Sequence, residues 1–157
     1  MQSVEVGGGR IIGEACHFID LLRHLAGSCI TDWNAVSIGC SKASDVSSDK
    51  TIISLRFEDG SIGVINYLAN GHKKVPKERL EIFTAGRVIQ LDNFIKLKAF
   101  GWKNFKGKRL WKQDKGQRAC PREFINSIRS GAPSPIPIDE IIESSRISIE
   151  ISESLNL

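Results

Sequence analysis

The first segment with a regular apolar pattern lies between residues 13 and 26. Apolar side chains recur there at intervals of three and four residues, which is typical of an amphipathic helix. Gly27 follows directly, in a position that commonly ends a helix. The pattern therefore predicts a helix over residues 13–26 whose buried stripe comprises Ala15, Phe18, Ile19, Leu22, Leu25 and Ala26.

Two more helices are expected near the C-terminus. Residues 121–130 begin with Pro121, whose missing N–H costs little in a first helical turn, and they precede Gly131. A third helix is expected from residue 138 or 139 to residue 155, just after Pro137. Its many isoleucines are β-branched, and the alternation over residues 146–151 also fits a strand.

The middle of the chain alternates with a period of two, as strands do. The turn sequences Glu58-Asp59-Gly60 and Ala85-Gly86 separate neighbouring strands. Tight turns imply antiparallel pairing, because parallel neighbours need a long crossover. We therefore expect an α+β fold, a mostly antiparallel sheet of about six or more strands with helices packed on one face. The expected strands cover residues 33–40, 51–57, 61–68, 79–84, 87–91 and 94–100.

Such a sheet has a second face, and the strands carry more apolar residues than two or three helices can cover. Soluble monomers rarely expose a broad apolar patch. We therefore expect a homo-oligomer formed through the open sheet face. No repeat or domain linker interrupts the 157 residues, so residues 1–157 are expected to form a single domain. The apolar residues considered are Ile53, Leu55, Ile65, Leu80, Ile82 and Ile89.

The composition is that of an ordinary globular protein, with 41% hydrophobic and 25% charged residues. No apolar run approaches the ~20 residues that span a bilayer, and the first residues do not resemble a signal peptide. The four cysteines form no C-x-x-C pair, which favours reduced thiols over a metal or disulfide framework. We expect a cytoplasmic protein without membrane or metal partners. The cysteines are Cys16, Cys29, Cys40 and Cys120.

Much of the net charge of +4 comes from residues 96–122, where Trp102, Phe105 and Trp111 stand among lysines and arginines. Basic residues interleaved with aromatic rings can bind single-stranded nucleic acid. A solvated loop with a few core anchors gives the same pattern. The modest overall charge favours the loop, so a nucleic acid is not the partner that we expect.

The candidate chemistry lies on the first helix. His17, Asp20 and His24 share one side of it with Gly13, opposite the apolar stripe. Asp20 lies three and four residues from the two histidines, so the side chains can meet, and a carboxylate beside an imidazole suits general acid–base catalysis. Polar residues on the outer face of any amphipathic helix are the simpler alternative. Zinc fits less well, because the histidines are seven residues apart rather than four.

Residues 7–13, Gly-Gly-Gly-Arg-Ile-Ile-Gly, superficially resemble a dinucleotide-binding loop. However, only Val4-Glu5-Val6 could form the strand before it, and the expected acidic residue is missing beyond the helix. The antiparallel hairpins also contradict a doubly wound sheet. Flexible glycines leading into a helix that faces a ligand explain the segment better.

Residues 7–27 resemble the G-G-G-x-x-x-D-x-G-x-H-x-x-D-x-L motif of the glucose–fructose oxidoreductase and inositol dehydrogenase (Gfo/Idh/MocA) family, and residues 77–94 are similar to its paired strands. The resemblance implies the substrate half of an NAD(P)-dependent oxidoreductase that acts on a sugar, sugar nucleotide or polyol. It implies that His17 assists proton transfer from the substrate hydroxyl and that Asp20 supports it. We expect Arg10, Gly13 and His24 to contact the substrate.

The chain also departs from the family. Gly13 replaces the first motif aspartate, Ala15 replaces the motif glycine, and Glu14 points about 100° away along a helix. A non-catalytic dimerising module is therefore the alternative function. The family's nucleotide-binding domain has no counterpart in the sequence, so NAD or NADP is expected to be bound mainly by a missing N-terminal domain. The chain alone is expected to be inactive.

Overall fold

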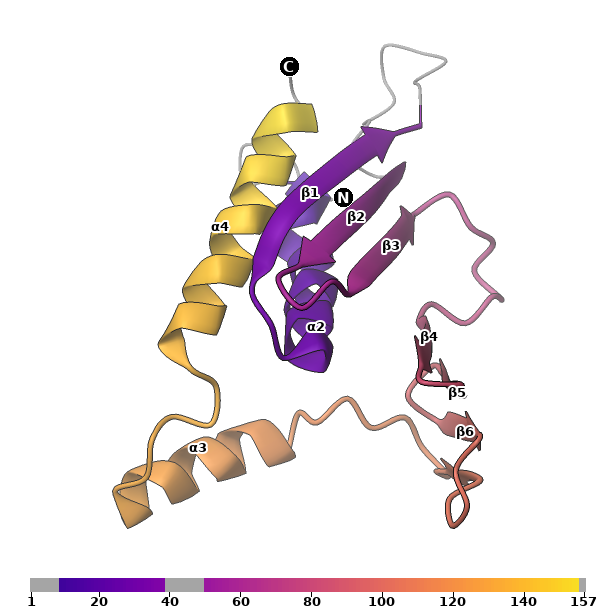
Figure 1. The fold of residues 1–157 in the computed structure, drawn as a ribbon, viewed down its shortest axis with the longest axis vertical. Helices are drawn as coiled ribbons and strands as arrows, with labels where there is room; N and C mark the ends of the chain where they lie inside the picture. Colours follow the sequence, from indigo (N-terminus) through magenta and orange to yellow (C-terminus); the bar gives the residue numbers. More distant parts are fainter. Residues whose placement is uncertain (1–8, 39–49, 156–157) are drawn as a thin grey trace. The chain divides into compact units, whose positions relative to one another are not determined.

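The computed structural model describes residues 9–38 and 50–155, which belong to two compact units (Figure 1). The first unit comprises Met1–Asn70 with Ser134–Leu157, and the second comprises Gly71–Pro133. That the two together form one domain stays a prediction.

In the first unit, helices cover one face of a three-stranded antiparallel sheet in the order β1-β2-β3 (Figure 1). The unit thus has the antiparallel α+β architecture expected from the sequence. Strands β1 and β2 begin earlier in the chain than expected and β3 begins one residue later, and residues 39 and 40 fall outside the described part. The elements are the π-helix η1 (Ile11–Ala15), α2 (Cys16–Ala26), β1 (Ile30–Ser37), β2 (Lys50–Phe57), β3 (Ile62–Leu68) and α4 (Ile138–Leu155).

The first helix ends where the sequence predicts but begins differently. Gly27 adopts the left-handed conformation with φ 63°, and its N–H bonds to the carbonyl oxygen of Arg23. At the other end, the Cys16 N–H bonds to the Ile11 carbonyl oxygen, five residues back, which defines a π-helical turn. The wider turn buries both Ile11 and Ala15 completely, so the apolar stripe extends further towards the N-terminus than expected.

The third predicted helix is confirmed as α4, despite its β-branched residues. Its buried face repeats every three to four residues, with serines as well as isoleucines facing inwards. The Ser148 hydroxyl donates to the Ser144 carbonyl oxygen at 2.6 Å, so this serine can be buried without losing its hydrogen bond. Tertiary packing therefore decides between helix and strand here. The buried residues are Ser144, Ile147, Ser148, Ile151 and Ser152.

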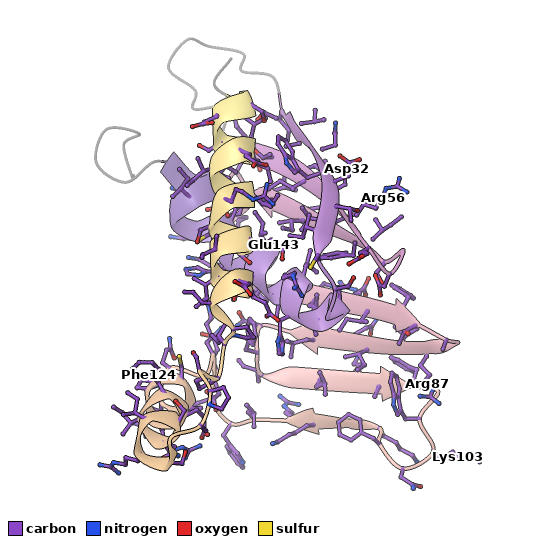
Figure 2. All side chains as sticks on the ribbon, turned by 60° about the vertical axis from the view of Figure 1, so that its left-hand side comes forward. Asp32, Arg56, Arg87, Lys103, Phe124 and Glu143 are labelled. Atoms are coloured by element: carbon purple, nitrogen blue, oxygen red, sulfur yellow. The ribbon has the colours of Figure 1, made fainter. Side chains whose placement is uncertain are left out.

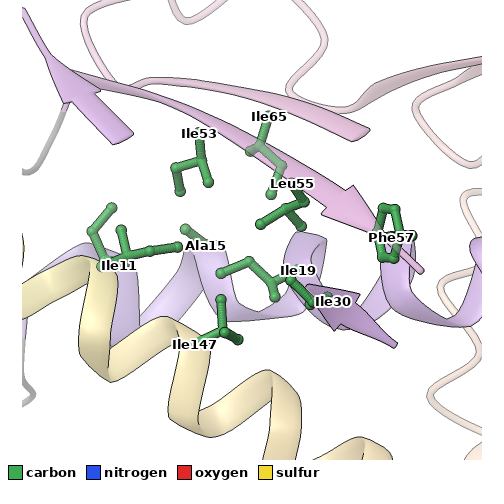
Figure 3. Packing of buried hydrophobic residues seen from close by; sticks show 10 residues of the cluster. Ile11, Ala15, Ile19, Ile30, Ile53, Leu55, Phe57, Ile65 and Ile147 are labelled. Atoms are coloured by element: carbon green, nitrogen blue, oxygen red, sulfur yellow. The ribbon is translucent and has the colours of Figure 1, made fainter. Parts of the chain in front are cut away.

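The hydrophobic core lies between the helices and the sheet (Figure 3). Burying each isoleucine or leucine side chain contributes about 1.5–3 kcal/mol. Ile53, Leu55 and Ile65 were expected to add to an uncovered sheet face, but they lie beneath the helices. The open face instead carries Val36, Ile52, Ile62 and Val64, which are 44–68% exposed. The core cluster comprises Ile11, Ala15, Ile19, Ile30, Ile53, Leu55, Phe57, Ile65, Ile147 and Ile151.

The second unit contains a separate antiparallel sheet in the order β4-β5-β6-β7 and one helix. The strands therefore form two sheets rather than one. Ala85 and Gly86, with φ of 44° and 73°, make the predicted tight turn between β4 and β5. Strand β7 was missed because it is three residues long and lacks apolar alternation. The elements are β4 (Arg79–Thr84), β5 (Arg87–Asp92), β6 (Lys96–Phe100), β7 (Gly107–Arg109) and α3 (Ala119–Ser130).

Among the described residues, no helix combines the length and the apolar content needed to cross a bilayer.

An ion pair at the C-terminal end of α2 joins three elements of the first unit. The Arg23 Nε donates to Glu143 Oε2 at 2.6 Å, and the Ile30 N–H donates to Glu143 Oε1 at 2.6 Å. Arg23 is only 8% exposed. The hydrogen bond to Glu143 raises the pKa of Arg23, and burial opposes this rise. Glu143, labelled in Figure 2, thus connects α4 to both the end of α2 and the start of β1.

We predict that Glu143→Gln lowers the free energy of unfolding by about 2–4 kcal/mol, because it removes the nearer of the two carboxylates that pair with a buried guanidinium, while Glu140 stays 3.8 Å from Arg23. Urea unfolding followed by circular dichroism measures the change. Arg146→Gln is the control, since it breaks an exposed pair with Glu150 on the same helix. It should cost no more than about 0.5 kcal/mol. Equal costs for both variants would contradict a special role for Glu143.

Candidate functional site

The polar face of α2 points away from the core. His17 and His24 are exposed and Asp20 is half-buried, whereas Ile19 on the opposite side is fully buried. The two imidazoles are therefore accessible to a ligand or to another part of a larger protein. Outward orientation of this face is the minimum that a role in substrate chemistry requires.

Asp20 is held by α4 rather than by the neighbouring histidines. The Ser144 hydroxyl donates a long hydrogen bond of 3.4 Å to Asp20 Oδ1. Within residues 9–38 and 50–155, no hydrogen bond or ion pair joins Asp20 to His17 or His24. Asp20 also acts on Cys16, whose pKa is raised first by burial and further by the negative charge of Asp20. The structure thus places Asp20 and His17 on one face without a direct contact.

A second polar cluster lies where η1 meets β3. Arg10 Nη1 lies 3.5 Å from Glu14 Oε1, and the Tyr67 hydroxyl donates to Glu14 Oε2 at 2.8 Å. Burial raises the pKa of Tyr67, and the Glu14 carboxylate adds to this rise. Gly13 is half-buried within the π-helical turn. Glu14 is therefore engaged with Arg10 and Tyr67.

Sequence reasoning missed Tyr67 and Ser144. Tyr67 shares its face of β3 with Ile65, and this alternation places it beneath the helices but does not identify its partner. Ser144 lies in the buried stripe of α4. The sequence alone does not show whether a serine in such a stripe only packs in the core or also binds a functional residue. Only the packing of α4 against α2 reveals its bond to Asp20.

Neither of two cavities in the described part of the chain is lined by His17 or Asp20. The larger, about 410 Å³, lies in the second unit next to the loop between β6 and β7. The smaller, about 170 Å³, is lined mainly by residues of β1 and β2, among them Asp32 and Arg56, which lie close together in Figure 2.

No metal centre is evident in the described part of the chain. No group of three His, Cys, Asp or Glu side chains gathers there in a way that could hold a metal ion. Cys16, Cys29 and Cys120 have free thiols. Cys40 lies outside the described residues.

Comparison by sequence finds neither a matching protein-family model nor a matching curated protein. Comparison of the fold finds similar solved structures with 15–20% identity. UDP-N-acetylglucosamine 3-dehydrogenase from Acidithiobacillus ferrooxidans has a TM-score of 0.68 and 18% identity. An oxidoreductase from Agrobacterium radiobacter was solved with NAD+, L-tartaric acid and magnesium. It has a TM-score of 0.69 and 15% identity. A dehydrogenase from Bordetella pertussis, in complex with NADH and UDP-GlcNAcA, has a TM-score of 0.52 and 20% identity.

The similarity covers most of this chain but only part of each solved structure. It spans 88%, 91% and 92% of the chain, against 44%, 46% and 42% of the three solved proteins in the same order. The chain thus spans less than half of their length. The similarity confirms the fold that the resemblance to Gfo/Idh/MocA-type oxidoreductases implied.

Proposed function

We propose that this chain forms the substrate side of an NAD(P)-dependent oxidoreductase that acts on a hydroxyl or carbonyl group of a sugar, sugar nucleotide or polyol. The observation that carries the proposal is the outward polar face of α2, with His17 exposed at the motif position, on a fold shared with sugar-nucleotide dehydrogenases. We also propose a cytoplasmic location, which the free thiols of Cys16, Cys29 and Cys120 favour.

The described residues do not fit a dinucleotide cradle. Every strand pair in the two sheets is antiparallel, whereas such a cradle is built on parallel strands around a helix. We therefore propose that NAD or NADP is bound mainly by an N-terminal domain. This domain would correspond to the part of the solved structures that the chain does not span. Without it, the chain should be inactive.

In the proposed reaction, His17 takes the proton from the substrate hydroxyl during oxidation and returns it during reduction. An exposed imidazole is suited to this work near neutral pH. Asp20, which accepts a hydrogen bond from the Ser144 hydroxyl, adds a negative charge on the same face of α2. Arg10, Gly13 and His24 complete the proposed substrate contacts.

We predict that His17→Ala in the full-length protein lowers kcat/KM by about 10²- to 10⁴-fold, the usual contribution of a general acid–base group. The measurement is nicotinamide reduction with a panel of sugars, polyols and sugar nucleotides that includes UDP-N-acetylglucosamine. His72→Ala is the matched control, because His72 is an exposed histidine of the second unit. Unchanged kcat/KM in the His17 variant would show that the assigned role is wrong.

The Arg10–Glu14–Tyr67 cluster is proposed to hold Arg10 in place for the substrate. Tyr67 is the only tyrosine of the chain, so ultraviolet titration reports on it alone. We predict that Glu14→Gln lowers the pKa of Tyr67, because the negative charge that disfavours the phenolate is removed. Glu153→Gln removes an exposed charge on α4 and should leave the titration unchanged. An unaltered titration in the Glu14 variant would mean that the cluster does not form.

The second candidate function is a non-catalytic dimerising module, motivated by Gly13 in place of the motif aspartate. Both candidates predict self-association through the open face of the β1-β2-β3 sheet. Val36, Ile52, Ile62 and Val64 share that face and are exposed in the single chain. Covering such a patch with a second copy removes apolar surface from water.

We predict that the protein is at least dimeric at micromolar concentration and that Val64→Glu makes it monomeric, because a charge would be buried without a partner. Light scattering measures the mass. Ile128→Glu places the same charge on an exposed position of α3 and should leave the mass unchanged. A monomeric wild-type protein would contradict the proposed interface. Activity of a monomeric Val64→Glu variant of the full-length protein would separate catalysis from self-association.

A further inference from the structure

The cavity of about 410 Å³ in the second unit combines aromatic and basic side chains. It is lined by Arg87 at the start of β5 and by residues of the loop between β6 and β7. Its volume lies within the ~300–1,000 Å³ that is common for small-ligand pockets. The lining residues are Arg87, Gly101, Trp102, Lys103, Asn104 and Phe105.

Two glycines fix the shape of this loop. Gly101 has φ 82°, and a Cβ there would lie 3.0 Å from the Gly86 carbonyl oxygen, so the loop lies close against the β4–β5 turn. Gly107 has φ 144°, and a Cβ there would lie 2.3 Å from the Leu97 carbonyl oxygen. Side chains at either position would displace backbone. The loop between them is therefore held in a defined conformation over the sheet.

The aromatic residues of the cavity present ring surface. Phe105 is 41% exposed although it lines a cavity, and Trp102 is half-buried. The Arg87 guanidinium lies 5.4 Å from the centre of the Trp102 ring, in cation–π contact. This contact orients Arg87 towards the loop while its N–H groups keep their capacity to donate. Ring faces of this kind stack on planar bases.

The charges of the cavity favour an anion. Within the described residues, neither Arg87 nor Lys103 forms an ion pair with a carboxylate. Figure 2 shows both residues at the same end of the β4-β5-β6-β7 sheet. Residues 87–109 contain seven lysines and arginines but a single acidic residue, Asp92. Arginine and lysine side chains commonly bind phosphate groups, and among the described residues these two have no carboxylate partner that would compete with a phosphate.

We infer that this cavity is a binding site for a nucleoside phosphate. The base stacks on the aromatic rings of Phe105 and Trp102, and the phosphate groups bind Arg87 and Lys103. The Asn104 side-chain amide can both donate to and accept from the edge of a base. The cavity accommodates one small ligand, which is a free nucleotide or one nucleotide of a single strand. The inference depends on the second unit alone and does not require the proposed oxidoreductase function.

The test follows the indole N–H signals of the three tryptophans by NMR, in the full chain, during titration with UDP at about 50 mM salt. The Trp102 signal should shift and saturate, whereas the Trp33 signal should not move. Phe105→Ala and Lys103→Glu should each weaken binding about tenfold or more, through lost stacking and lost charge. Lys112→Glu is the matched control, because Lys112 belongs to the same basic segment but does not line the cavity.

Two further titrations identify the source of the ligand. The first titration uses an oligothymidylate. A single-stranded nucleic acid is indicated if this probe binds more tightly than UDP, if its affinity falls steeply at about 200 mM salt, and if its binding depends on Phe105. Tighter binding of UDP would indicate a free nucleotide. Inorganic phosphate should bind more weakly than UDP. The inference is overturned if neither nucleotide probe shifts the Trp102 signal, if phosphate equals UDP, or if Lys112→Glu weakens binding as much as Lys103→Glu.

Discussion

The packing of the first helical segment against the sheet is the constraint on which the rest of the first unit depends. Ile11, Ala15 and Ile19 are completely buried against Ile53 and Leu55, so η1 and α2 can rotate very little about their axis. Because the apolar stripe is fixed inwards, the opposite face must point outwards. The position of His17 is therefore a consequence of hydrophobic burial, and no polar contact is needed to explain it.

Electrostatic contacts refine this arrangement at both ends of the helical segment. Near its C-terminal end, Glu143 pairs with Arg23 and accepts a hydrogen bond from the first N–H of β1. These two contacts fix the position of α4 relative to α2 and β1. At its N-terminal end, Glu14 connects Arg10 to Tyr67 on β3. A buried ion pair contributes little net stability but is costly to break. These contacts therefore favour one arrangement of the elements over alternatives that bury the same apolar residues.

Much of the secondary structure could be predicted from the sequence, because periodicity and glycine positions act locally. Gly27 and Gly131 end α2 and α3 as expected, and Ala85-Gly86 forms the turn between β4 and β5. The π-helical turn could not be predicted, since an apolar repeat shows which face is buried but not which carbonyl accepts each hydrogen bond. Arg23 was not expected in the core, because its burial depends on Glu143, which is 120 residues away. For the same reason the sequence placed His17 and Asp20 on one face but could not identify Ser144 as the partner of Asp20.

The central claim is that the outward face of α2 receives the substrate. A crystal structure of the full-length protein with a nicotinamide cofactor and a bound sugar nucleotide tests it most directly. The account predicts that a ring nitrogen of His17 lies within about 2.6–3.2 Å of the substrate hydroxyl that reacts, and that Arg10 and His24 lie beside the same ligand. A substrate bound away from α2, with His17 facing only solvent, would contradict the account.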